Sequence, residues 1–530
     1  MFTDIKAKLL YKAFQVMNER TFGSNPLESP MDRQKEFLLN VLRRQAETEY
    51  GRVYDFAHIK TIEEYQRRVP LTKYQDYEPY YERMQQGEAD LLFKDELIAW
   101  ILTSGTTSAV KTIPLSDYME QRLGMAVTSL YLAYIDENPQ ENVKCLSGKL
   151  LSIVGNPCVG SINGVPTGYV TGVALAAKAK NKLTASMFTP TVDVLLEKDW
   201  ARKYWLISQQ AVRQDVSMIT GLPLYVVDYL DKLDSDHKYR LGLGDKTIPE
   251  IWPNLKLMIW SGAKFGGYST RLKELVGERV DFRESYGSTE TGLLAHQIGD
   301  EPGMAPVLGN AFIEFIPISE WYEMETQGGD YQNFEFTAHT FENVEPGLDY
   351  VIVLTTAGGL YRYLIGDTVV FHQTDIPRFS WSGRTLWYTN VALERLTFAQ
   401  VESAMTMLGL LIRCPISNFS YAVSRTPPRY TFVIETDGEP YCFEDVSALL
   451  DECLGKNQFN YQHCREDGVL LPPNVSLVPY GTYAALERKT IQEREDSVGQ
   501  FKAPRYTDME TIWLIKSLAA GGVSQGDGEN

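Results

Sequence analysis

The sequence is poor in the residues that build metal centres and cross-links. It has six histidines and six cysteines in 530 residues, and no two cysteines stand in Cys-x-x-Cys spacing. This argues against a zinc site and a dense disulfide framework, and it makes a reducing compartment the expected one. No Gly-x-Ser-x-Gly string is present and the histidines are dispersed, which argues against a serine hydrolase.

Basic residues are also fewer than acidic residues. Lysine and arginine number 51 against 69 acidic residues, which gives a formal net charge of −18 at pH 7. A general affinity for nucleic acid or for an anionic membrane requires a basic surface, so neither partner is expected. A polyanionic small molecule can still bind where positive groups gather locally.

Long apolar runs are missing as well, and no segment reaches the length of a membrane span. The first 25 residues are amphipathic and charged, without the apolar core of a signal peptide. Apolar residues make up 44% of the chain and aromatic residues 12%, enough over this length for a large core plus at least one further domain. We therefore expect a globular, cytoplasmic protein. We also expect it to be a monomer.

Strands that alternate with helices follow a largely helical start of the chain. The expected strands are short apolar runs at residues 97–102, 149–154, 216–220, 256–261 and 280–284. This alternation implies βαβ units and a mainly parallel sheet. Ligands in such folds bind outside the carboxyl ends of the strands. The glycines between Gly160 and Gly172 predict an irregular connection, with a mobile wall of a substrate pocket as the functional alternative.

Beyond residue 300 the pattern becomes β-rich and then changes again. Residues 311–317, 350–355 and 359–371 alternate or run apolar, which predicts a small distorted barrel or an antiparallel sheet. The pattern breaks between Arg384 and Leu396, and the following segment reads as a small α+β domain. From Ser517 the chain is rich in Gly and Ser, which predicts disorder. The expected division is a large domain (1–384), a hinge (385–396), a small domain (397–516) and a disordered tail (517–530).

A turn rich in hydroxyl groups follows the first predicted strand. It consists of Thr103, Ser104, Gly105, Thr106 and Thr107. Such a turn offers backbone N–H groups and hydroxyls to a ligand rich in acceptor oxygens, of which a triphosphate is the usual one. It is not a Walker loop, because Val110 stands where that pattern needs glycine. The alternative is an ordinary solvated turn, since these residues are common in loops.

A second cluster follows the strand at 280–284 and consists of Tyr286, Gly287, Ser288, Thr289 and Glu290. The aromatic ring can stack on a heteroaromatic base, the hydroxyls can contact phosphate, and the carboxylate can hold the Mg²⁺ that accompanies a nucleoside triphosphate. Taken as an isolated string, it is equally a turn with a buried tyrosine.

Two further strings carry candidate ligand-binding groups. Asp367 follows Gly366 near a strand end and could accept both ribose hydroxyls of a nucleotide, although an aspartate that caps a turn is the simpler interpretation. Lys502 lies in a loop with little acid nearby, where a solvated charge is the common case.

Four features occur in a fixed order along the chain: the string that begins at Thr103, the string that begins at Tyr286, the pair Gly366-Asp367, and Arg384. Together they resemble the motifs of the adenylate-forming enzyme superfamily. More narrowly, the whole chain resembles the acyl-acid amido synthetases of the auxin-responsive Gretchen Hagen family. The narrower resemblance extends through residues 49–51, 69–74, 252–254, 312–317, 360–363 and 500–505. It implies an α/β fold with a large N-terminal domain, built of helix-flanked parallel sheets plus a β-rich subdomain, and a small mobile α+β C-terminal domain.

The resemblance implies a two-step reaction. A carboxylate attacks the α-phosphorus of ATP to give an acyl adenylate and pyrophosphate, and an amine, usually of an amino acid, then displaces AMP. The implied residue roles follow the motifs. Ser104, Thr106 and Thr107 would hold phosphates, Gly262 and Ala263 would line the adenine pocket, Tyr286 would stack on adenine, Ser288 and Thr289 would approach the α-phosphate, Glu290 would bind Mg²⁺, Asp367 would hold the ribose, Lys502 would neutralise charge during adenylation, and Arg384 would act near the hinge.

The chain departs from the plant enzymes at three places. Ser108-Ala109-Val110 lacks the extra glycine of the phosphate turn, the string from Tyr286 to Glu290 looks more like the wider superfamily, and Leu393 to Thr397 replaces an acidic stretch after the hinge. A plant-hormone substrate therefore does not follow from the resemblance. An acyl-CoA ligase or stand-alone acyl-adenylating enzyme and a non-catalytic nucleotide-binding protein remain the alternatives. Against the CoA ligase, the C-terminal end lacks a Gly-Lys-x-x-Arg ending.

Overall fold

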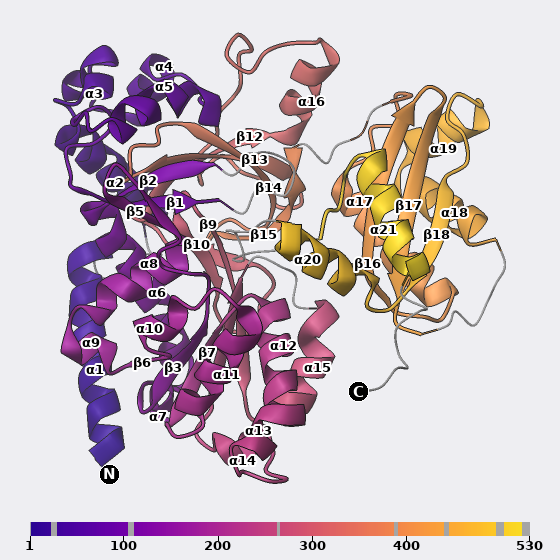
Figure 1. The fold of residues 1–530 in the computed structure, drawn as a ribbon. Coiled ribbons are helices and arrows are strands. Elements are labelled where there is room, and N and C mark those ends of the chain that lie inside the picture. Colours follow the sequence, from indigo (N-terminus) through magenta and orange to yellow (C-terminus); the bar gives the residue numbers. More distant parts are fainter. Residues whose placement is uncertain are drawn as a thin grey trace. The chain divides into compact units, whose positions relative to one another are not determined.

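The computed structural model describes residues 2–22, 29–103, 111–261, 266–385, 389, 391–438, 445–493 and 503–521. Contacts divide these residues into a larger unit, which runs to Trp381, and a smaller unit that begins at Ser382. Figure 1 shows both units, and each is described by itself below. None of the helices in the described ranges combines the length and the apolarity needed to cross a membrane.

The larger unit begins with helices, as expected. Their bounds are α1 Phe2–Phe22, α2 Pro30–Arg44, α3 Glu49–Val53, η1 Phe56–His58, α4 Ile62–Arg68 and α5 Tyr74–Gln85. The apolar face of α2 is buried and consists of Phe37, Leu38, Val41 and Leu42. These helices enclose a core rich in tyrosine, to which Tyr50, Tyr65, Tyr77, Tyr81, Tyr361 and Tyr363 contribute.

A small sheet with the strand order β2-β1-β5-β4 packs against this core. Its strands are β1 Leu97–Leu102, β2 Thr112–Ser116, β4 Gly160–Ile162 and β5 Val165–Gly168. The expected irregular connection from Gly160 to Gly172 is therefore wrong, since this segment forms the β4–β5 hairpin and the start of α8 (Val170–Ala179). The turn is Asn163-Gly164 with φ of 47° and 80°, the pairing that two-residue hairpin turns favour.

The main sheet has eleven described strands in the order β12-β13-β14-β15-β11-β10-β9-β8-β7-β3-β6. Their bounds are β3 Lys149–Ile153, β6 Phe188–Thr189, β7 Val216–Gly221, β8 Leu257–Ser261, β9 Asp281–Ser288, β10 Gly292–Gln297, β11 Met304–Pro306, β12 Ala311–Pro317, β13 Asp349–Thr356, β14 Tyr363–Gln373 and β15 Arg378–Arg384. From β6 to β9 neighbouring strands pair in parallel, whereas β9 to β11 and β12 to β14 pair in antiparallel fashion. The predicted parallel and antiparallel parts are thus one sheet, joined at β9.

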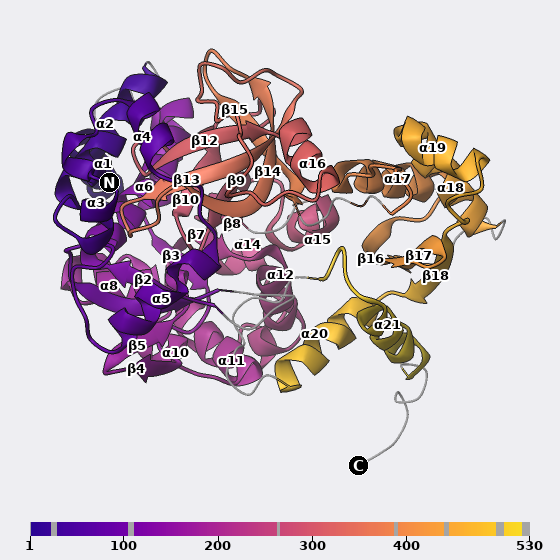
Figure 2. The same cartoon turned by 90° about the horizontal axis from the view of Figure 1, so that it is seen from above.

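Helices cover both faces of the parallel half (Figures 1 and 2). Side chains of α11, α12, α14 and α15 share one core with Leu151, Ile153 and Ile219, whereas α1 and α6 share another with Leu150 and Met218. This alternation along β3 and β7 is what a strand buried on both faces requires. The remaining helices of this unit are α6 Asp117–Glu137, α7 Pro139–Asn142, η2 Val143–Leu146, α9 Lys182–Ala185, α10 Val192–Leu195, α11 Trp200–Ala211, α12 Pro223–Lys232, η3 Leu233–His237, α13 Lys238–Arg240, α14 Ile248–Ile251, α15 Gly266–Val276 and α16 Ile318–Thr326.

The smaller unit has a three-stranded sheet in the order β16-β17-β18, in which β16 and β17 form a hairpin and β18 runs parallel to β17. Its elements are α17 Phe398–Leu411, β16 Ile416–Arg425, β17 Pro428–Thr436, α18 Val446–Asn457, α19 Phe459–Glu466, β18 Asn474–Pro479, α20 Thr482–Glu493 and α21 Met509–Gly521. The expected disorder from Ser517 is wrong up to Gly521, because Ile512 and Ile515 are buried and Leu518 packs beside them. Residues 522–530 lie outside the described ranges.

The chain enters the smaller unit through a compact loop around Glu394. The backbones of Thr389 and Leu396 exchange hydrogen bonds of 3.0 and 2.9 Å. The fully buried Glu394 carboxylate accepts bonds from Val391 N (2.9 Å), Ala392 N (2.7 Å) and the Tyr430 hydroxyl (2.6 Å). These bonds anchor the described part of segment 389–396 to β17.

Candidate active site

The turn after β9 lies where the parallel and antiparallel halves of the sheet meet. Tyr286 is 8% exposed and donates a hydrogen bond of 2.8 Å from its hydroxyl to Oδ2 of Asp367 on β14. Three strands separate β9 from β14 in the sheet order, so this bond shows that the antiparallel half curls back on itself. The structure thus brings together the two residues that were predicted to bind adenine and ribose.

Gly287 and Ser288 shape the turn. A Cβ on Gly287 would lie 2.1 Å from the Gly292 carbonyl oxygen, so only glycine lets β10 pass this close. The Ser288 hydroxyl accepts hydrogen bonds from the backbone N–H groups of Glu290 (3.2 Å) and Thr291 (3.3 Å). Thr289 is half-buried in the same turn. The Ser288 hydroxyl therefore orders the backbone of the turn that contains Ser288 and Thr289, the two residues predicted to approach the α-phosphate.

Glu290 faces two buried tyrosines. Burial, and then the negative charge of Glu290, raise the pKa of Tyr363 well above its usual range, with hydrogen bonding to that carboxylate adding to the effect. Burial also raises the pKa of Tyr81, to which the charge of Glu290 adds a smaller part. Both phenols therefore stay protonated, and that of Tyr363 can donate a hydrogen bond to the carboxylate. Nothing in the sequence near Glu290 indicates that these two tyrosines are its neighbours.

Tyrosines of α5 connect the Glu290 turn to the base of the β1–β2 hairpin. Tyr81 lies edge-on to Trp100 of β1, with centroids 6.1 Å apart, and its ring is 5.7 Å from that of Tyr74. The Tyr74 hydroxyl contacts both the N–H and the C=O of Thr112 at 3.2 Å. At the other side of the hairpin base, Thr103 N donates to Lys111 O (2.9 Å). The predicted phosphate-binding residues Ser104, Gly105, Thr106 and Thr107 lie outside the described ranges.

Asp367 is 5% exposed and follows Gly366, whose φ of 84° is a conformation that glycine adopts without strain. The candidate adenine residues Gly262 and Ala263 come directly after β8 and lie outside the described residues. The end of β8 is tied to β9 by the Ser285 hydroxyl, which donates to Trp260 O at 2.8 Å. The sheet therefore holds the end of β8 beside Ser285 of β9.

The two predicted cationic residues do not belong to the larger unit that contains this site. Arg384 is exposed at the end of β15, on the far side of the boundary after Trp381. Lys502 lies outside the described residues. Their roles stay predictions.

A buried ion pair fixes the start of β14. Arg362 Nη2 lies 3.0 Å from Glu314 Oε1, and Nη1 donates to the carbonyls of Gln66 (2.7 Å) and Val69 (2.9 Å). The φ of Arg362 is 47°, a strained conformation for a residue with a side chain. These contacts hold the segment that leads to Tyr363 and Asp367. The signal in the sequence was a charged residue inside an otherwise apolar and aromatic string.

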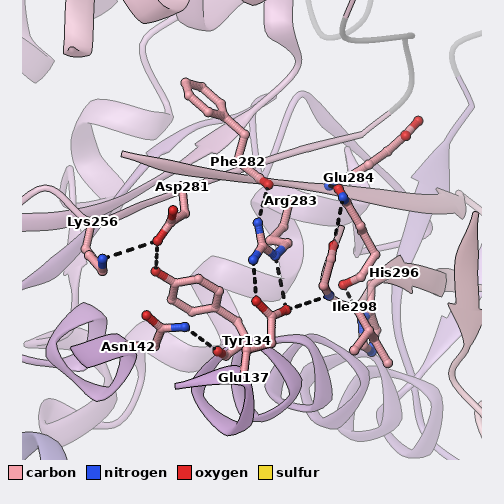
Figure 3. A network of polar contacts seen from close by, with 12 residues as sticks. Tyr134, Glu137, Asn142, Lys256, Asp281, Phe282, Arg283, Glu284, His296 and Ile298 are labelled. Carbon is pink, nitrogen blue, oxygen red and sulfur yellow. Dashed lines mark hydrogen bonds and ion pairs between the residues drawn. The ribbon is translucent and has the colours of Figure 1, made fainter. Parts of the chain in front are cut away.

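A polar network ties the start of β9 to α6, the helix that follows the hairpin (Figure 3). Tyr134 donates to Asp281 Oδ2 at 2.5 Å, and Lys256 Nζ lies 3.3 Å from the same oxygen. The Arg283 guanidinium pairs with Glu137, with Nε 3.2 Å from Oε1. This network fixes the strand that carries Tyr286 relative to the helix that packs against β10.

The residues present fit a magnesium ion held mainly by its nucleotide. No group of three or more His, Cys, Asp or Glu side chains in the described ranges could hold a metal by itself. Mg²⁺ bound with a nucleotide commonly takes one or two protein carboxylates, while phosphates and water supply the other oxygens. A single carboxylate such as Glu290, backed by protonated phenols, matches that mode.

The fold is that of the adenylate-forming enzymes. A solved structure of GH3.15 acyl acid amido synthetase superposes with a TM-score of 0.73 at 18% identity, covering 96% of this chain and 95% of that chain. The same protein in complex with 2,4-DB gives 0.70 at 19% identity, with 96% coverage of both chains. A 2-hydroxyisobutyryl-CoA ligase in complex with 2-HIB-AMP gives 0.55 at 13% identity, covering 94% of this chain and 93% of that chain.

The chain belongs to the GH3 family. The family's N-terminal domain model matches residues 25–232, its central domain model 304–384 and its C-terminal domain model 399–511, together more than half of the chain. Curated relatives include jasmonoyl–L-amino acid synthetase GH3.5 of Oryza sativa subsp. japonica, 22% identical over 92% of this chain and 94% of the relative. Indole-3-acetic acid-amido synthetase GH3.10 of Arabidopsis thaliana is 24% identical over 89% and 92%. The 4-substituted benzoates-glutamate ligase GH3.12 of the same plant is 22% identical over 83% and 87%.

Proposed function

We propose that this protein is an ATP-dependent acyl-acid amido synthetase. It activates a carboxylic acid as an acyl adenylate with release of pyrophosphate, and it then transfers the acyl group to the amine of an amino acid with release of AMP. Family membership supports this assignment, because the relatives named above are acid–amino acid ligases. The observation that carries it within the molecule is the contact of Tyr286 with Asp367, two candidate nucleotide residues 81 positions apart.

In the proposed site, different turns at the carboxyl ends of strands bind different parts of the nucleotide. In the first turn, phosphates are held by the hydroxyls of Ser104, Thr106 and Thr107 and by the backbone around Gly105. Thr103 closes the base of this turn. Gly262, Ala263 and Gly287 border the base and Tyr286 offers the accessible part of its ring to it, while Asp367 accepts the ribose hydroxyls. Ser288 and Thr289 approach the α-phosphate. Each of these groups supplies positioning or charge, which is what adenylation requires.

The reaction needs charge neutralisation at the α-phosphate and a second nucleophile afterwards. Glu290 holds Mg²⁺, which neutralises phosphate charge when bound. Lys502 neutralises charge that develops in the first step, and Arg384 acts near the hinge at residues 385–396. Rotation about this hinge lets the small domain supply a cation for adenylation and then admit the amine. The acyl carbon then forms a C–N bond as its bond to the AMP oxygen breaks.

We further propose that the enzyme works as a cytoplasmic monomer. A reducing environment accords with its cysteines, since the five in the described ranges are all free thiols.

Product analysis tests the proposal against a CoA ligase. The protein is incubated with ATP, Mg²⁺, CoA, a pool of carboxylic acids and a pool of amino acids, and the products are identified by mass spectrometry. Amides together with AMP and pyrophosphate are expected. A CoA thioester in place of an amide would reassign the second step, and nucleotide binding without turnover of any acid would leave a non-catalytic binding protein.

A further inference from the structure

Two oppositely charged side chains lie on α6 and α8, two helices that contact each other. Glu120 lies in the first turn of α6 and Lys178 near the end of α8, and both are half-buried. Gly124, one turn after Glu120, makes room for the lysine. A Cβ at Gly124 would lie 3.2 Å from Lys178 Cε and 3.4 Å from its Nζ. A glycine inside a helix costs about 1 kcal/mol relative to alanine, so the space for this lysine is kept at the expense of helix stability.

Neither charge has a close partner in the part of the chain that the structure describes. Among the described residues, no ion pair or hydrogen bond involves the Lys178 ammonium or the Glu120 carboxylate, whereas Arg283, which is also withdrawn from water, pairs directly with Glu137. Burial lowers the pKa of Lys178 and the charge of Glu120 partly offsets this. Burial raises the pKa of Glu120, with Lys178, Lys180 and Asp117 as the other charges it senses. Both groups thus lose hydration without gaining a hydrogen bond from each other.

The pair lies beside the candidate active site. Leu123, between Glu120 and Gly124 in the sequence, packs against Gly292, where a Cβ would come 2.2 Å from Leu123 Cδ2. Gly292 is two residues beyond Glu290 and pairs with Ser288 across β9 and β10. At its other end α8 packs on the chain that leaves the carboxyl end of β3, because a Cβ on Gly172 would meet Gly155 O at 2.3 Å. Both helices therefore border the edge of the sheet at which the substrates are expected.

We propose that Lys178 and Glu120 bind the head group of the amino acid that the proposed function gives as the amine substrate. The Lys178 ammonium receives the amino acid carboxylate, and Glu120 receives the ammonium group before it loses a proton and attacks. An α-amino acid carries these two charges on groups bonded to the same carbon atom, which matches a cation and an anion held on two helices in contact. The inference rests on the proposed function, and it adds the two residues that select the acceptor.

The test separates the two half-reactions. Lys178→Met and Glu120→Gln are compared with wild type in acid-dependent exchange of pyrophosphate into ATP, which needs no amine, and in amide formation with each proteinogenic amino acid supplied singly. The expected effect of Lys178→Met is a KM for the accepted amino acid about ten- to a hundredfold higher, from loss of a charge-assisted contact, with exchange retained. Lys180→Met, an exposed lysine of the same segment, serves as the matched control and should leave the KM within about twofold.

The decisive comparison uses the accepted amino acid and its carboxamide, which lacks the negative charge. Lys178→Met should lower the preference of the enzyme for the acid over the carboxamide by about tenfold or more. Equal losses with both acceptors, or a parallel loss of pyrophosphate exchange, would overturn the assignment of Lys178. If wild type shows exchange but forms no amide with any amino acid, the proposed function fails instead, whatever the variants do.

Discussion

The hydroxyl of Tyr286 and the carboxylate of Asp367 are joined by a hydrogen bond of 2.8 Å. The two residues come from β9 and β14, and their contact closes the antiparallel half of the main sheet beside the turn that carries Glu290. The bond also orients the aspartate, because one of its oxygens is held by a donor that does not belong to a ligand. A carboxylate fixed in this way loses little rotamer freedom when it accepts the hydroxyls of a ribose.

Replacing Tyr286 with phenylalanine should weaken nucleotide binding without unfolding the protein. The ring stays, but Asp367 loses the donor that orients it, so the Kd for ATP should rise by about three- to tenfold, the effect of one hydrogen bond. Isothermal titration calorimetry measures this directly. Tyr350→Phe is the control, since its hydroxyl accepts a bond from Glu345 N in the same half of the sheet. An equal loss in both variants would assign the effect to the fold.

Glu290→Gln should weaken the response of adenylation to Mg²⁺. The amide keeps the shape of the side chain but offers no negative charge to a divalent cation, so acid-dependent pyrophosphate exchange should fall by about a hundredfold and need more Mg²⁺. Exchange is measured over a Mg²⁺ titration, with Glu301→Gln as the control because Glu301 is an exposed acid paired with Arg378. An unchanged titration curve in Glu290→Gln would show that another group holds the metal.

Lys502→Ala should slow the first half-reaction far more than the second. The lysine is expected to neutralise phosphate charge only during adenylation, so pyrophosphate exchange should fall by at least about a hundredfold. Amide formation from a supplied acyl adenylate should fall by less than about fivefold. The exposed Lys516 of α21 provides the control Lys516→Ala. Equal losses in the two assays would reject a role confined to adenylation.

The Arg362–Glu314 pair predicts a large loss of stability from a small change. Glu314 is fully buried and Arg362 nearly so, and Glu314→Gln would leave the guanidinium without a counter-charge. The free energy of unfolding of this domain should fall by about 3–5 kcal/mol. Asp231→Asn breaks the exposed pair with Arg271 and should cost about 1 kcal/mol or less. Urea denaturation compares the two, and similar losses would contradict the structural importance of the buried pair.

Acidification should destabilise the main sheet through His296. This β10 residue is 5% exposed, and burial lowers its pKa to about 4. An unfolded chain binds a proton at this histidine near pH 6.5, so protons favour unfolding as the pH falls from about 6.5 to 4. The loss amounts to about 3 kcal/mol and is complete near pH 4. His296→Gln should flatten the stability profile in this window, and an unchanged slope would show that other groups cause the acid sensitivity.

Local patterns were enough to predict most strands and the parallel sheet. The short apolar runs 97–102 and 216–220 form β1 and β7, because apolar runs of this length suit strands that are largely buried within a sheet. The β4–β5 hairpin was not predicted, although Asn163-Gly164 is a strong turn signal, because recurring glycines over so short a stretch are more typical of an irregular loop. Gly168 and Gly172 leave no room for a side chain, because the backbones of Pro157 and Gly155 pass close to them. No local sequence pattern reveals these contacts.

Partners from distant parts of the chain could not be predicted for the candidate site. The motif residues were found from their chemistry, and Tyr286 and Asp367 do meet. Tyr81 and Tyr363, by contrast, reach Glu290 from α5 and β14, and that meeting depends on how the sheet curls. The Lys178–Glu120 pair likewise arises from the packing of α8 on α6, and a lone Lys or Glu in a helix gives no sign of it.

The central claim is that the acid passes through an acyl adenylate, and an isotope measurement tests it most directly. An accepted carboxylic acid labelled with ¹⁸O in its carboxylate is incubated with the protein, ATP, Mg²⁺ and an amino acid, and the nucleotide products are analysed by mass spectrometry. The account predicts one ¹⁸O atom in the AMP released for each amide formed. Label in inorganic phosphate with formation of ADP, or amide formation with unlabelled AMP, would contradict it.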